Sequence, residues 1–316
     1  MNKGEGIHRM AQSVSALPDA VKAHILLHVC RLGDYEPVIG LMGKTGSGKS
    51  SLCNALFASD ITPVNDVIAC TREPLRFRLR MGRHSMVLVD LPGVGESAAR
   101  DHEYAALYQR LLPRMNLILW VIKADDRALS VDEQFYRDVI GAHRDKVLFV
   151  VNQADKLEPC HEWDNASQTL SPLQKVNLSH KLRDIRSQFS PNNPVCAISA
   201  KHGWGLSQMV DNLMRALPAK ASSPFQTQLN DNLRSHSVKE SARADFGKSV
   251  GGVLDKAAML PFIPETVRAL ILGVRDSVVS VARAIWDFFF WINNTSHLPI
   301  SKACCSRSRL FLFHFE

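Results

Sequence analysis

The chain has 316 residues, of which 46% are hydrophobic and 22% are charged, and its formal net charge is +7 at pH 7. This composition is typical of a folded globular protein and excludes the intrinsically disordered and fibrous classes. The mild basic excess favours an anionic partner such as RNA or a lipid surface, but no dense block of lysine and arginine marks where such a partner would bind.

The cysteines and the N-terminal residues bear on the location of the protein. The seven cysteines show no CxxC spacing, which favours reduced thiols over a disulfide framework or a metal site. The first twenty residues contain no apolar signal core. We therefore predict a cytoplasmic protein, with peripheral attachment to a membrane as the alternative.

The predicted elements begin with an amphipathic helix over residues 16–32, inside an N-terminal segment of residues 1–36. From residue 37 to 217, strand-like runs alternate with helical patterns. The six strand-like runs are "PVIGLMG", "LRFRLRM", "SMVLVDLPG", "NLILWVIKA", "KVLFVVNQA" and "PVCAISA". Most are apolar throughout, as in central strands that helices cover on both sides. The alternation predicts an α/β fold with a mainly parallel six-stranded sheet and helices on both faces.

The sequence changes character after residue 217. Residues 218–246 are polar and rich in turn formers, which predicts an irregular linker. Residues 247–292 are predicted to be helical, with an apolar stripe that begins at Val267 and repeats at alternating spacings of four and three. Residues 293–316 show no period and are predicted to form a flexible tail.

Three interpretations of the apolar stripe remain open. The stripe can pack against the rest of the chain, associate with a second copy or a partner, or lie on a membrane surface. The aromatic run "WDFFFWI", residues 286–292, favours the last of these. Charged residues interrupt the stripe, so we predict no transmembrane helix.

The stretch "GKTGSGKS", residues 43–50, matches G-x-x-x-x-G-K-S between an apolar strand and a helix. Its glycines allow the backbone N–H groups to surround phosphates, and the start of the helix favours anions. Lys49 is expected to act catalytically on the β- and γ-phosphates, and the Ser50 hydroxyl to bind Mg²⁺. The predicted nucleotide-binding residues here are Gly43, Lys44, Thr45, Gly46, Ser47, Gly48, Lys49, Ser50 and Ser51.

A second phosphate-side element is "MVLVDLPG", residues 86–93. Asp90 is expected to hold Mg²⁺ through water, and the Gly93 N–H to approach the γ-phosphate and contribute to catalysis. The polar residues 59–74 are predicted to form a loop, in which Thr71 is the candidate for a catalytic metal ligand that closes over Mg²⁺ and the γ-phosphate. Thr62 competes for that role, and a threonine that caps the local backbone is the alternative.

With "NQAD" at residues 152–155 and "SAK" at residues 199–201, these motifs resemble the Era-like branch of the TRAFAC class of GTPases, with septin-like features in the phosphate loop. Within that branch the chain is similar to GTPases encoded by bacterial prophages and genomic islands. The resemblance covers residues 37–217 and implies a P-loop NTPase fold of the Ras-like G-domain type, which binds GTP and GDP with Mg²⁺. The guanine-side residues that it implies are Asn152, Gln153, Asp155, Ser199, Ala200 and Lys201.

The chemistry of Asp155 agrees with a guanine site. Its carboxylate can accept hydrogen bonds from guanine N1–H and the exocyclic amine, whereas adenine offers no such donor pair. Gln153 stands where the family has a lysine, whose stem covers the base and which helps to tie this segment to the phosphate loop. The shorter, uncharged side chain predicts weaker affinity with the guanine preference retained.

The resemblance also implies GTP hydrolysis. At two positions, however, this sequence lacks a side chain that other GTPases use for hydrolysis. Val94 stands where many GTPases have a water-orienting glutamine, and Gly46 where potassium-dependent relatives have an asparagine. We therefore predict a slow GTPase that acts as a switch and is stimulated by a partner or by dimerisation, through the G domain or the C-terminal helix. The alternative is a nucleotide-gated binding scaffold with little hydrolysis. The sequence does not choose among ribosome or RNA, a membrane surface and another protein as partner.

Overall fold

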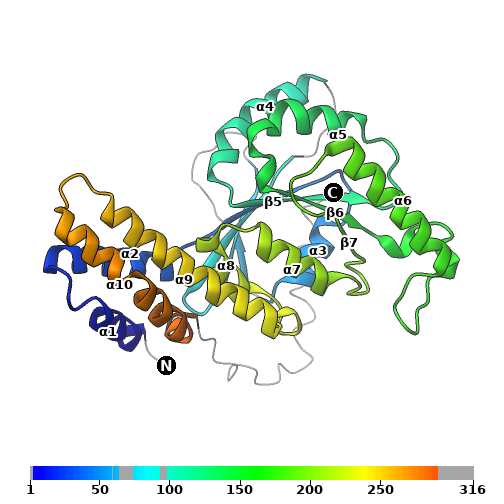
Figure 1. Cartoon of the computed structure of the whole chain (residues 1–316). Helices are drawn as coiled ribbons and strands as arrows, with labels where there is room; N and C mark the ends of the chain where they lie inside the picture. Colours follow the sequence, from blue (N-terminus) through cyan, green and yellow to red (C-terminus); the bar gives the residue numbers. More distant parts are fainter. Residues whose placement is uncertain (1–2, 59, 64–73, 93–97, 291–316) are drawn as a thin grey trace.

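The computed structural model of the chain describes residues 3–58, 60–63, 74–92 and 98–290. It shows a twisted β-sheet between two layers of helices, with further helices from both ends of the chain beside the sheet (Figure 1). Thr71, Gly93 and Val94 lie outside the described residues, as does the predicted tail.

The sheet has seven strands in the order β2-β3-β4-β1-β5-β6-β7. The strands from β4 to β7 in this order pair in parallel, whereas β2 and β3 pair antiparallel at one edge. The strands are β1 (Val38–Met42), β2 (Asp60–Pro63), β3 (Arg76–Met81), β4 (His84–Asp90), β5 (Leu117–Lys123), β6 (Val147–Asn152) and β7 (Cys196–Ala197). The predicted mainly parallel α/β fold is confirmed, and β2 is an additional edge strand in a segment that was predicted to be a loop.

The α-helices are α1 (Lys3–Ser13), α2 (Asp19–Gly33), α3 (Lys49–Leu56), α4 (Ala98–Leu111), α5 (Ser130–Phe135), α6 (Pro172–Phe189), α7 (Leu206–Ala216), α8 (Ala219–Gln228), α9 (His236–Ala258), α10 (Glu265–Ala284) and α11 (Trp286–Phe290). Short turns of 3-10 or π helix are η1 (Leu112–Arg114), η2 (Tyr136–Ile140), η3 (Gly141–Lys146), η4 (Ala154–Lys156), η5 (Cys160–Glu162) and η6 (Asp231–Leu233). Side-chain caps fix where some of the helices begin. At α6 the Ser171 side chain and Gln174 form a reciprocal capping box, and Ser235 caps α9.

Both faces of the central strands β1, β4, β5 and β6 are mainly buried, as the apolar runs predict. Successive side chains of a strand point to opposite faces. In β5, Leu119 belongs to the core under α3, α7 and the terminal helices, whereas its neighbour Trp120 belongs to the core under α4, α5 and α6. The helices from the two ends of the chain therefore share one continuous core with the sheet.

The predicted linker over residues 218–246 is wrong. Residues 221–228 of α8 are all buried, and α9 begins at His236. The two serines of α8 have partners inside the protein: Ser222 Oγ donates to Asp245 at 2.7 Å, and Ser223 Oγ donates to the Ala242 carbonyl at 3.0 Å. Burial of these groups is tolerated because they have hydrogen-bond partners. The division of the chain into domains stays a prediction.

The apolar stripe of α10 packs internally. Ile271 and Val278 are fully buried, and the partly buried Val267 and Val274 contact the same core. The aromatic residues of α11, the described part of the run that favoured a membrane surface, are also buried, since all three phenylalanines are at most 7% exposed. Among the described residues, no helix has the length and apolar character needed to cross a membrane.

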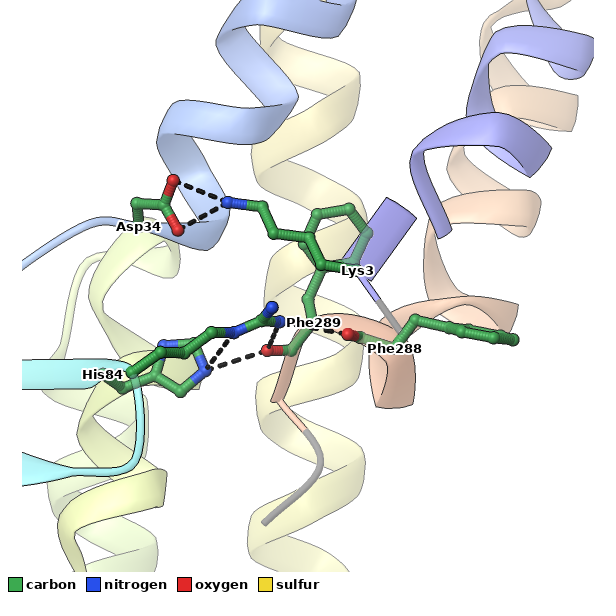
Figure 2. Close-up of polar contacts among 6 residues, drawn as sticks. Lys3, Asp34, His84, Phe288 and Phe289 are labelled. Atoms are coloured by element: carbon green, nitrogen blue, oxygen red, sulfur yellow. Dashed lines mark hydrogen bonds and ion pairs between the residues drawn. The ribbon is translucent and has the colours of Figure 1, made fainter. Parts of the chain in front are cut away.

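The end of α11 is held by the turn between β3 and β4 (Figure 2). The Arg83 guanidinium donates to the carbonyls of Phe288 and Phe289, and His84 Nε2–H donates to Phe289 O at 2.8 Å. Carbonyls at the end of a helix have no partner within the helix, so these donors satisfy them, and the positive charge of Arg83 complements the helix dipole. The C-terminal helices are thereby fastened to the strand that ends at Asp90.

Candidate functional site

The phosphate loop joins β1 to α3, and two of its glycines are required by close contacts. Gly43 has φ +146° and Gly48 has φ +90°, conformations that side chains rarely adopt. A Cβ at Gly43 would lie 2.3 Å from the Val121 carbonyl oxygen, and a Cβ at Gly48 would lie 2.3 Å from Asn152 Nδ2. The loop therefore packs its backbone directly against β5 and the end of β6.

Lys49 and Asp90 lie at the start of α3 and the end of β4. Lys49 Nζ donates to the Gly43 carbonyl at 2.7 Å. Burial lowers the pKa of the Lys49 ammonium, and the charge of Asp90 partly opposes that shift. Burial raises the pKa of Asp90 to about 6, against the lowering effect of Lys49. The two groups form an oppositely charged, partly desolvated pair beside the phosphate loop.

The donor set fits a divalent cation. Asp90 Oδ1 is buried and has no hydrogen-bond partner among the described residues. An unpaired buried carboxylate oxygen is costly unless a cation or a proton occupies it. Ser50, one residue after Lys49, supplies the hydroxyl oxygen that Mg²⁺ accepts in sites of this kind. Asp90 and Ser50 are therefore the residues that would hold Mg²⁺.

Asn152 connects the phosphate loop to the segment that follows β7. Its Nδ2 donates to Ser47 O at 2.9 Å, and its Oδ1 accepts from the Ala200 N–H at 3.1 Å. The side chain is almost completely buried. One amide thus fixes the distance between the two loops that the sequence assigned to the phosphates and to the base.

Gln153 makes a second bridge between the same parts. Its backbone has φ +63°, and its Nε2 donates to the Gly46 carbonyl at 2.8 Å. Tying the base side of the site to the phosphate loop is the role that the resemblance gave to lysine at this position. The structure therefore shows that glutamine supplies this tie.

Asp155 is held in place by the segment after β7. Ser199 Oγ donates to Asp155 Oδ1 at 2.6 Å, and His202 Nε2 lies 3.8 Å from Asp155 Oδ2. Ser199 is itself fully buried, and its backbone N–H donates to the carbonyl of Trp204. A carboxylate fixed in this way has a defined direction, which a hydrogen-bonding base reader requires.

Lys44 departs from the simplest expectation for a phosphate-loop lysine. Its Nζ lies 3.0 Å from Asp126 and 2.9 Å from Asp132, and it donates to Ala128 O at 2.6 Å. Burial lowers the pKa of Lys44, but the hydrogen bonds that its ammonium donates to these carboxylates outweigh burial and raise the pKa above its ordinary value. Its charge is neutralised by Asp126 in the loop after β5 and by Asp132 in α5, so any phosphate contact would come from its backbone.

The remaining predicted residues are placed as follows. Thr45 and Ser51 are exposed on the loop and on the first turn of α3, and Lys201 is exposed after β7. Thr62, the competitor of Thr71, lies in β2 with Arg78 of β3 as its pairing partner. This placement assigns Thr62 to the sheet edge, and the metal-side threonine stays a prediction at Thr71.

Sequence reasoning missed Lys123, the last residue of β5. Its Nζ lies 3.2 Å from the position that a Cβ at Gly46 would take. Within the described ranges no ion-pair partner is recorded for Lys123, in contrast to Lys44. The available signal was its place at the carboxyl end of a strand next to the phosphate-loop strand, where ligands bind in open α/β sheets.

Comparisons with known proteins agree with this geometry. A sequence model of the family described as 50S ribosome-binding GTPase matches residues 38–153. The chain is 55% identical to "Uncharacterized protein YkfA" of Escherichia coli (strain K12) over 291 residues, which are 92% of this chain and 100% of that protein. With the same coverage it is 54% identical to "Uncharacterized protein YfjP" of the same strain.

A crystal structure of Aquifex aeolicus Era bound to GDP and AlF4⁻ covers 60% of this chain and 66% of Era, at 20% identity and a TM-score of 0.42. A similarity of this size is too low to carry a functional conclusion.

Proposed function

The chain belongs to the family of P-loop GTPases that includes YkfA and YfjP, and from this premise we propose that it hydrolyses GTP slowly in the presence of Mg²⁺ and acts as a nucleotide-dependent switch. The observation that carries the proposal is the double bridge between the base side and the phosphate side. Asn152 binds Ser47, and Gln153 binds Gly46. A site in which both halves are fixed to each other is suited to one ligand that spans them.

Different residues of the chain would bind the phosphates, neutralise their charge and hold Mg²⁺. The N–H groups of the phosphate loop and the start of α3 would bind the β- and γ-phosphates. Lys49 would exchange its bond with the Gly43 carbonyl for phosphate oxygens, because the developing charge there is a stronger acceptor. Asp90 and Ser50 would hold Mg²⁺, which supplies further charge neutralisation when it is bound. Catalysis would then rest on positioning and charge.

Guanine selectivity would come from Asp155. The carboxylate keeps an acceptor direction set by Ser199 Oγ, and its partners leave lone pairs for the N1–H and amino donors of guanine. Adenine would leave these acceptors unpaired in a confined site, a mismatch that can discriminate strongly. Gln153 supports the proposal because it keeps the tie to Gly46, while its short side chain covers less of the base than a lysine stem would.

Hydrolysis is proposed to be slow because the sequence has Val94 where many GTPases have a water-orienting glutamine. Stimulation would come from a second copy, through the G domain or the C-terminal helices, or from a partner that recognises the GTP state. The family description names the 50S ribosome, which makes ribosomal RNA and protein the first partners to test. A cytoplasmic location is part of the same proposal.

The test is phosphate release from GTP by the full chain, measured with and without Mg²⁺ and over a range of protein concentrations. Lys49→Ala should abolish release, whereas Lys248→Ala should not, because Lys248 is a surface lysine of α9 that pairs with Asp245. GTP binding without release above the Lys49→Ala background would reject the GTPase and favour a nucleotide-gated scaffold. Equal binding of ATP and GTP would reject the guanine assignment.

A further inference from the structure

The connection between α9 and α10, residues 259–264, exposes two large apolar side chains. Met259 is 79% exposed and Phe262 is 74% exposed, whereas the other large apolar side chains recorded as exposed in the described part of the chain are at most 51% exposed. Scattered exposed apolar residues are normal at a protein surface, but two highly exposed ones in one short loop call for an explanation. We name these six residues the α9–α10 loop.

The α9–α10 loop is a structured turn. The Leu260 N–H donates to Ala257 O at 3.3 Å, and the Ile263 N–H donates to Leu260 O at 3.1 Å. Ile263 is partly buried and packs against the core, so it anchors the loop. From the other side, Arg268 Nε donates to Ala258 O at 2.9 Å. The exposure of the two apolar side chains is therefore built into the turn.

The position of the loop separates it from the nucleotide site. Helices α9 and α10 run side by side, and the loop that joins them forms the end of the helical part that is farthest from the sheet (Figure 1). Nothing else of the described chain covers Met259 and Phe262. The aromatic residues of α11, which the sequence suggested for a membrane surface, are buried and do not compete for this role.

The size and shape of the surface indicate its occupant. Large side chains present about 200 Å² each, so the two exposed ones offer on the order of 300 Å² of apolar surface. A stable protein interface needs about 800 Å² from each partner, so this loop alone is too small for a second copy or for another folded protein. A protruding loop with two apolar side chains instead matches the interface of a bilayer, into which apolar groups enter by a few ångströms.

We propose that the α9–α10 loop inserts Met259 and Phe262 into the surface of a lipid bilayer that carries anionic headgroups. The charge next to the loop favours such headgroups, because Glu265 directly after the loop is paired with Arg268 at 2.9 Å. Lys256 is exposed one turn before the loop, and no ion-pair partner is recorded for it in the part of the chain that the structure describes. A lysine beside an inserted apolar group can lay its stem on the apolar layer and its ammonium among the headgroups.

The test is sedimentation of the full chain with vesicles made of equal parts of phosphatidylcholine and phosphatidylglycerol. The wild type should co-sediment, and the double variant Met259→Ser/Phe262→Ser should bind at least about tenfold more weakly. Lys256→Glu should weaken binding to these vesicles more than binding to pure phosphatidylcholine. Nucleotide affinity should be unchanged in these variants, because the loop is remote from the phosphate loop.

The matched control is the double variant Leu173→Ser/Val176→Ser, which removes two exposed apolar side chains from α6. It should bind vesicles as the wild type does. Failure of the wild type to co-sediment, equal binding by the loop variant, or an equal loss in the control would overturn the proposal. A dimer in sedimentation equilibrium that only the loop variant abolishes would assign the loop to a second copy instead. Neither the vesicle assay nor the sedimentation-equilibrium measurement depends on GTP hydrolysis, so failure of this proposal and failure of the proposed function can be told apart.

Discussion

Acidification should loosen the contact between α11 and the sheet through His84. The imidazole stands at the start of β4 and donates to the carbonyl of Phe289 (Figure 2). The pKa of His84 is lowered to about 4, chiefly by burial and to a smaller extent by the charges of Arg83 and Lys3, while the Phe289 carbonyl and Asp34 oppose the shift. His84 is therefore neutral in the folded protein at physiological pH.

The sign and the size of the effect follow from this shift. The unfolded chain binds a proton to His84 near its ordinary pKa of 6.5, but the folded chain does so only near 4. The contribution of His84 to stability is therefore complete above pH 6.5 and is lost as the pH falls towards 4. At about 1.4 kcal/mol for each pKa unit, the full loss is about 3 kcal/mol, of which about 2 kcal/mol is reached by about pH 5.

Urea unfolding of the wild type and of His84→Gln, at neutral pH and at about pH 5, measures this contribution. Glutamine keeps an N–H donor for the Phe289 carbonyl but does not titrate in this range. The free energy of unfolding should fall on acidification by about 2 kcal/mol more in the wild type than in the variant. The comparison cancels the titration of the other groups. An equal fall in both proteins would refute the assignment to His84.

Three further predictions concern the nucleotide site. Gly48→Ala should lower GDP affinity at least about a hundredfold in a fluorescence titration, because the alanine Cβ would lie 2.3 Å from Asn152 Nδ2. Unchanged affinity would contradict the loop geometry. Asp155→Asn should move the preference from guanine towards xanthine nucleotides in a competition assay, and no change would mean that the base is read elsewhere. Lys123→Met should weaken GTP binding about tenfold, while Lys123→Arg should retain it. Equal affinity of Lys123→Met and the wild type at low salt would exclude a role for this charge.

The sequence was sufficient for the sheet because buried parallel strands leave a strong signal. Each of the six strand-like runs contains a strand, and most of these runs are apolar throughout because the strand is covered on both faces. The edge strand β2 was not predicted from the sequence, because it has only four residues, begins with Asp60 and ends with Pro63. Both residue types are rare inside strands, and pairing with β3 decides the structure there.

The error over residues 218–246 has a different cause. The segment is rich in serine and contains further polar residues such as asparagine and glutamine, which normally indicates an exposed loop. In the fold these groups find partners far away in the sequence: Trp286 Nε1 donates to Ser223 Oγ at 2.9 Å, and Gln228 Nε2 donates to His84 O at 3.3 Å. Sequence periodicity cannot reveal such partners, because each bond joins residues separated by at least 63 positions.

In α10 the periodicity predicted the helix correctly but did not predict what its apolar stripe contacts. Its spacing predicts a helix with one apolar face, and the structure confirms the helix. The spacing cannot tell what covers that face, since an internal helix, a second copy and a bilayer all present apolar atoms. The close packing of Ile271 and Val278 inside the chain decides between them, and Met259 and Phe262 of the α9–α10 loop remain the most exposed large apolar side chains in the described part of this region.

In the candidate site, too, some residues could be predicted from the local sequence, whereas others depend on contacts that form only in the folded chain. The phosphate loop and Asp90 were predictable because their roles require particular residues next to particular elements. The function of Gln153 was not predictable, because its identity suggested a lost lysine. Its left-handed backbone directs the amide to the Gly46 carbonyl, so the brace between base and phosphates is kept with a neutral side chain. The positive charge on this side of the loop comes instead from Lys123, which lies against Gly46 from the neighbouring strand. We propose that these two residues together take the place of the lysine in the family pattern, with Gln153 for the tie and Lys123 for a positive charge.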